Sequence, residues 1–98
     1  MRLHELKTWP AMFRAVDRDG KRFEVRSTAD RQFSIGDVLL LKEWNPEIGM
    51  YTGRTILVEV TYGIRGTDIP GGQVRVDSVI LGFSVVRPLM PGASEALA

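Results

Sequence analysis

Apolar and polar positions alternate with a period of two along most of this chain, and the alternation predicts strands with one buried face. The clearest example is residues 54–65, where every second residue from 56 to 64 is apolar. The segments 45–53 and 66–73 are rich in glycine and polar residues, which is typical of loops. Further strands are expected at residues 2–7, 21–27, 33–44 and 74–87, with a turn at Gly36-Asp37 and a bulge or bend at Gly82.

One helix is expected near the N-terminus. Thr8 is a candidate N-cap, and Pro10 would lie in the first turn, where its missing N–H costs no hydrogen bond. The helix should end near Asp17, before the turn at Asp19-Gly20. An apolar stripe at helical spacing supports it: Trp9, Met12, Phe13 and Val16.

These elements predict an α+β fold. Consecutive strands with a single helix argue against alternating βαβ units and favour a small mixed β-barrel, closed or nearly closed, with one or two helices packed beside it. A chain of this length suits one domain, which we place at residues 1–87, followed by a flexible C-terminal tail at 88–98. The side chains expected in the core are Phe23, Val25, Leu39, Leu41, Val58, Val60, Leu81 and Phe83.

Charge and composition restrict the partners. The formal net charge is +1, so any nucleic-acid binding must rest on a local basic patch. With no cysteine and one histidine, His4, we expect no metal site. The absence of a P-loop or dinucleotide-binding motif predicts no cofactor. No apolar run approaches the roughly 20 residues of a membrane span, and no signal-peptide pattern is present, so we expect a cytoplasmic domain without a membrane partner.

Charged residues are dense between positions 21 and 37. Arg22, Glu24 and Arg26 share one face of a predicted strand, as residues two apart do. One interpretation is a solvated face with a ladder of weak ion pairs. The other is a ligand pocket, because arginine recognises phosphate and a glutamate can accept from an amine or move a proton. The full set is Lys21, Arg22, Glu24, Arg26, Asp30, Arg31 and Asp37.

The aromatic residues and His4 leave two interpretations open. Core packing is the default for Trp9 and Trp44, yet an aromatic ring beside a basic cluster can stack on a nucleic-acid base. A lone histidine such as His4 is more often structural than functional.

Four segments, in this order and spacing, resemble a bacterial and phage domain of unknown function in the ASCH branch of the PUA-like superfamily. They are HELKTWPAMF, KRFEVR, DRQFSIGDVLLLKEW and NPEIGMYTGRT, and the resemblance runs from about His4 to Tyr62. It implies a PUA-like β-barrel with a helix beside a cleft. It also implies recognition of RNA or a modified nucleotide in that cleft.

The residues that match the ASCH pattern are Gly20, Lys21, Glu24 and Arg26, and those that match the narrower family are His4, Leu6, Lys7, Asp30-Arg31 and Gly36-Asp37. The resemblance therefore implies nucleotide-binding roles for His4, Lys7, Lys21, Glu24, Arg26 and Arg31. Some ASCH proteins are similar to small amidohydrolases that act on acetylated cytidine with a lysine, a threonine and a glutamate. Here the chain departs from that pattern, since the threonine position holds Glu24 and the last strand has no glutamate. The catalytic candidates that the resemblance implies are Lys21 and Glu24.

The leading hypothesis is an RNA- or modified-nucleotide-binding module with a charged cleft beside the barrel. The alternatives are a small amidohydrolase acting on a modified nucleoside, with Lys21 as the amine and Glu24 as the acid/base, and a protein-interaction accessory module that binds no nucleic acid.

Overall fold

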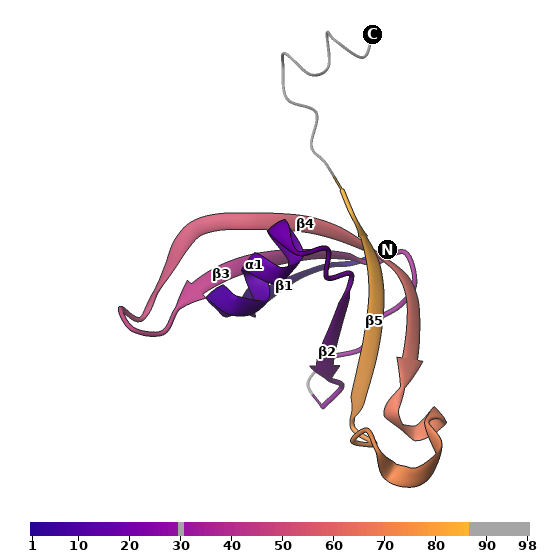
Figure 1. Cartoon of the computed structure of the whole chain (residues 1–98). Coiled ribbons are helices and arrows are strands. Elements are labelled where there is room, and N and C mark those ends of the chain that lie inside the picture. Colours follow the sequence, from indigo (N-terminus) through magenta and orange to yellow (C-terminus); the bar gives the residue numbers. More distant parts are fainter. Residues whose placement is uncertain (30, 87–98) are drawn as a thin grey trace, which may run out of the picture.

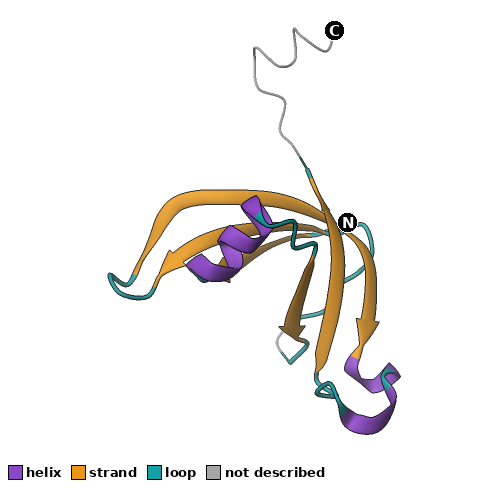
Figure 2. Cartoon of the chain, in the orientation of Figure 1, coloured by secondary structure: helices purple, strands orange, loops and turns teal. Residues whose placement is uncertain are grey.

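The structure is a computed structural model, and it describes residues 1–29 and 31–86. In these ranges it contains one α-helix, five strands and two short 3-10 turns (Figure 2). The elements are β1 (Leu3–Thr8), α1 (Pro10–Arg18), β2 (Phe23–Ser27), β3 (Val38–Asn45), β4 (Met50–Arg65) and β5 (Ser78–Val85), with the 3-10 turns Gly66–Asp68 and Pro70–Gly72 between β4 and β5. The α+β class is confirmed, whereas Asp30, the predicted domain boundary at 87 and the predicted tail lie outside the described residues.

The five strands form one mixed sheet in the order β1-β3-β4-β5-β2. The β1–β3 pair is parallel and the other three pairs are antiparallel. The sheet curves into a half-barrel, and α1 lies within the curve beside β3 and β4 (Figure 1). The predicted barrel is confirmed in part: the sheet forms a half-barrel, in which β1 and β2 remain edge strands and do not pair to close it.

The core lies on the inner side of this curve. Phe13 and Val16 of α1 are buried, and Val16 packs with side chains of β1, β3, β4 and β5. Six of the predicted core residues are confirmed as buried: Leu39, Leu41, Val58, Val60, Leu81 and Phe83.

The prediction that Phe23 and Val25 are buried is wrong, since 48% and 54% of their surfaces are exposed. The partner strand explains the error. In β2, Glu24 lies opposite the buried Leu81 of β5, and residues opposite each other in an antiparallel pair share a face. The charged face of β2 therefore turns inward, and the apolar face turns outward.

The start of the helix also differs from the prediction. Thr8 is not an N-cap: it ends β1, and its hydroxyl donates to the Leu6 carbonyl over 3.2 Å. Trp9 occupies the N-cap position without a capping hydrogen bond from its side chain, and Pro10 begins the helix as expected. This arrangement places Trp9 at the junction between β1 and α1.

A shift of register in β4 lies across from Gly82, where the sequence predicted a bulge or bend. Val60 pairs with Phe83 and Tyr62 pairs with Gly82, so Thr61 is the extra residue. An extra residue reverses the alternation of faces. Tyr62 is consequently 63% exposed rather than in line with the buried Val60.

Candidate functional site

The two edge strands face each other across a gap, and the side chain of Arg26 crosses it. Arg26 of β2 donates from Nη2 to the main-chain carbonyl of Lys7 in β1 over 3.1 Å. Two neighbouring cavities lie along this gap, and Lys7 and Arg26 line both of them. We call the two cavities together the seam.

The first of these cavities lies beside α1, and we call it the helix-side cavity. Its volume is about 460 Å³. Its lining combines the apolar side chains of Trp9, Met12, Phe23 and Val25 with Lys21 and Glu24.

The second lies toward the β3–β4 hairpin, and we call it the hairpin-side cavity. Its volume is about 380 Å³, and its lining is more polar. It includes Glu5, Ser27, Arg31, Phe33 and Tyr51.

Glu24 pairs with two of the three cations that line the helix-side cavity. Its Oε1 accepts from Lys21 Nζ over 2.6 Å, and its Oε2 accepts from Arg26 Nε over 3.2 Å. Glu24 is only 5% exposed, so its charge is tolerated because both oxygens are paired. We conclude that Glu24 positions Lys21 and Arg26 and offers little surface of its own to a ligand.

Aromatic side chains stand exposed along the seam. Trp9 is 57% exposed, Phe23 48% and Tyr51 43%. The Lys21 ammonium lies 5.0 Å from the centroid of the Phe23 ring, which is within the range of a cation–π contact. Core packing was the default interpretation for Trp9 and the prediction for Phe23, so these exposed aromatic side chains were not predicted from the sequence. The feature of the sequence that could have indicated an exposed Trp9 is its position directly before Pro10, at the end of the apolar stripe of the helix.

The structure brings together five of the six residues to which the resemblance gave nucleotide-binding roles. Lys7, Lys21, Glu24, Arg26 and Arg31 all line the seam, although they come from positions up to 24 residues apart.

His4, the sixth residue, lies apart from them. It is buried, its Nε2 is 2.8 Å from Asp37 Oδ2, and its ring centroid is 4.7 Å from that of Phe33.

The His4–Asp37 pair fastens the start of β1 to the turn before β3. Asp37 also accepts from the main-chain N–H groups of Arg2 and Ser34, both over 3.0 Å. Burial raises the pKa of Asp37, but the hydrogen bonds from His4, Arg2 and Ser34 outweigh it, and the pKa is lower than the ordinary value. Among the described residues, the buried side-chain polar atoms of this cluster all have hydrogen-bond partners within the protein.

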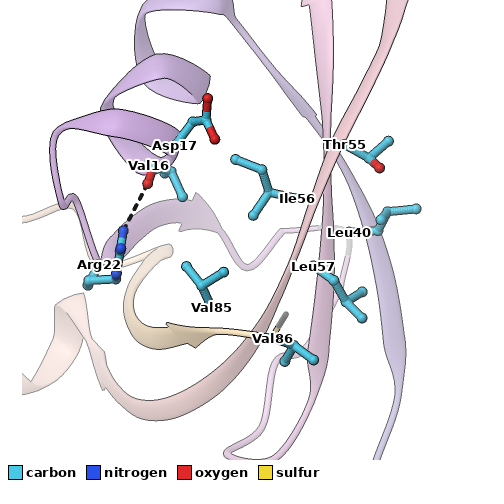
Figure 3. Close-up of a pocket in the computed structure, with 9 residues that line it drawn as sticks. All are labelled: Val16, Asp17, Arg22, Leu40, Thr55, Ile56, Leu57, Val85 and Val86. Atoms are coloured by element: carbon cyan, nitrogen blue, oxygen red, sulfur yellow. Dashed lines mark hydrogen bonds between the residues drawn. The ribbon is translucent and has the colours of Figure 1, made fainter. Parts of the chain in front are cut away.

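A third cavity, of about 370 Å³, lies between α1 and strands β3, β4 and β5 (Figure 3). Its walls are mostly aliphatic, including Val16, Ile56 and Val85. The guanidinium of Arg22 at its edge donates from Nη1 to the Val16 carbonyl over 2.9 Å (Figure 3). With few groups for chemistry, it is a weaker candidate than the seam.

In residues 1–29 and 31–86, no three histidine, aspartate or glutamate side chains gather as metal ligands would. No helix in this part of the chain is long and apolar enough to cross a membrane.

The fold and the seam define a small α+β half-barrel domain with a charged and aromatic groove between its edge strands. Residues 3–83 match the family described as Domain of unknown function (DUF3850), and the chain belongs to that family. A comparison with curated proteins finds no match.

Proposed function

We propose that this domain binds single-stranded RNA or a nucleotide in the seam. The observation that carries the proposal is the exposure of Trp9 and Phe23 in a cavity that also holds Lys7, Lys21 and Arg26. An aromatic face stacks on any base and contributes about 1–3 kcal/mol per base. Cationic side chains add charge-assisted hydrogen bonds to phosphate. The resemblance to ASCH domains of the PUA-like superfamily points to the same class of ligand, and on that basis we propose that the half-barrel is a PUA-like one in a cytoplasmic protein.

The distribution of charge supports local and modest binding. The seam contains four cations, Lys7, Lys21, Arg26 and Arg31, and Glu24 already pairs with two of them. Each neutralised phosphate contributes a salt slope of about −0.7 for single strands. We therefore expect a slope no steeper than about −3, the value for four phosphate contacts.

The geometry gives less support to an amidohydrolase. A lysine nucleophile must react as a neutral amine. Lys21 Nζ is instead 2.6 Å from a carboxylate oxygen, and the second oxygen of Glu24 is paired with Arg26. This arrangement suits an ammonium donor and a positioning carboxylate better than a nucleophile and a general acid/base.

The test is a titration of the full chain with short single-stranded RNAs and nucleotides. Binding is measured by fluorescence anisotropy or by chemical-shift changes. Trp9→Ala should weaken binding by about 5- to 100-fold, since it removes one stacking surface. Tyr62→Ala is the matched control, because Tyr62 is 63% exposed and lines neither cavity of the seam. If no ligand in the panel binds, or if both variants lose the same affinity, the proposal is wrong.

A further inference from the structure

The two cavities of the seam differ in chemistry. The helix-side cavity has Trp9, Met12, Phe23 and Val25 in its lining, which are apolar or aromatic side chains. The hairpin-side cavity also has aromatic side chains, Phe33 and Tyr51, but its lining is more polar and includes the Arg31 guanidinium. Because Lys7 and Arg26 line both, one ligand can occupy the two cavities at once.

We infer that the seam is a two-part site, in which the helix-side cavity takes a nucleobase and the hairpin-side cavity takes the phosphate joined to it through the ribose. The inference rests on the proposed function and adds to it a requirement: the ligand carries a phosphate. A nucleoside would fill only the helix-side cavity. An inorganic phosphate would fill only the hairpin-side cavity.

Arg26 is oriented for this role before any ligand binds. Its Nε donates to Glu24 and its Nη2 donates to the Lys7 carbonyl, so the plane of the guanidinium is defined at two points. A guanidinium has five N–H donors. Among the described residues, the two N–H groups on Nη1 have no hydrogen-bond partner. A donor pair that is already oriented loses less entropy when an anion binds.

Acidic groups do not cancel the charge of the hairpin-side cavity. Glu5 is the carboxylate that lines it, and Glu5 Oε1 is 3.2 Å from Lys42 Nζ. Lys7, Arg26 and Arg31 supply three positive charges, of which Arg26 is also paired with Glu24. The balance around this cavity therefore favours an anion.

The experiment measures how much a phosphate adds to affinity. The full chain is titrated at constant ionic strength with the best-binding ribonucleoside, its 5′- and 3′-monophosphates, and inorganic phosphate alone. The better monophosphate should bind at least about tenfold more tightly than the nucleoside, which is the value of one charge-assisted contact. Arg31→Gln should reduce this ratio by about fivefold or more and leave the nucleoside affinity unchanged.

Arg18→Gln is the control for the lost charge, since Arg18 has a 68% exposed side chain and lines neither cavity. Trp9→Ala should weaken nucleoside and monophosphate by the same factor. Equal binding of nucleoside and monophosphates, or an unchanged ratio in Arg31→Gln, would overturn the two-part site and leave the proposed function standing. Binding of phosphate alone as tightly as the monophosphate would also overturn it. Failure of these ligands and of the short single-stranded RNAs to bind would instead remove the proposed function itself.

Discussion

Arg26 of one edge strand donates a hydrogen bond to the carbonyl oxygen of Lys7 in the other, over 3.1 Å. The carbonyl is available because of the parallel pairing of β1. The Arg2 carbonyl accepts from the N–H of Val38 in β3, so the odd-numbered residues of β1 direct their main-chain groups away from β3. A cationic side chain thus covers an exposed strand edge, a common protection against unwanted pairing. The same side chain lines both cavities of the seam.

Arg26→Lys tests this bridge. The substitution keeps the charge but removes the planar fork that reaches Glu24 and Lys7 together. We expect a loss of about 1 kcal/mol in the free energy of unfolding, the net value of one hydrogen bond, with faster amide exchange in β2. Denaturant titration and hydrogen exchange measure both. The matched change Arg18→Lys, at an exposed position, should have little effect on stability. If the bridge contributed nothing to stability, the two variants would have the same free energy of unfolding.

Glu24→Gln should destabilise the domain. It leaves Lys21 and Arg26 without their counter-charge. This is costly because their side chains are only 14% and 26% exposed. We expect a loss of about 2–3 kcal/mol, at or below the lower end of the range for a broken buried pair because water still reaches the arginine. A solvated ladder of exposed ion pairs, the other interpretation of these charges, would be worth at most about 1 kcal/mol per pair. The measurement is denaturant titration, with Glu59→Gln at an exposed position in β4 as the control. If the two variants were equally stable, the ion pairs of Glu24 would be no stronger than exposed surface pairs.

Phe13→Ala and Phe23→Ala should separate clearly in stability. Phe13 is 1% exposed, and its removal should cost about 3–5 kcal/mol. Phe23 is 48% exposed, so its removal should cost only about 1–1.5 kcal/mol. The effect on nucleotide binding should have the opposite order. Phe23 lines the helix-side cavity and Phe13 does not, so only Phe23→Ala should weaken binding directly. Thermal melts and ligand titration on both variants provide the check, and comparable destabilisation would mean that β2 packs with its apolar face inward.

The lowered pKa of Asp37 predicts that the domain loses stability in acid. Its folded pKa lies below the ordinary value of 3.8, so the folded state binds its proton less readily than the unfolded state. The stabilisation is fully present above about pH 4 and is lost as the pH falls through the folded pKa. Asp37→Asn should lower the free energy of unfolding by about 2 kcal/mol at neutral pH. Below pH ~4, the stability of this variant should fall less steeply than that of the wild type. Melting temperatures at a series of pH values test this, with Asp68→Asn as an exposed control; an identical acid decline in the wild type and Asp37→Asn would exclude the assignment.

The sequence by itself determined the elements of this protein and their approximate positions. Alternation with a period of two depends only on the local geometry of a strand, and Pro10 marks the start of a helix wherever that helix packs. The sequence also showed the dense charges around Lys21, Glu24 and Arg26, because they are close along the chain.

Only the tertiary structure decided which face of β2 is buried. Alternation defines two faces but does not say which one meets the core. The choice came from β5, whose buried Val79 and Leu81 lie opposite Arg26 and Glu24, so the charged face turned inward and its ions had to pair. The seam has the same origin. Lys7, Trp9 and Arg31 approach β2 only because the sheet curves and stays open between its two edge strands, and the spacing of residues along a chain does not encode that curvature.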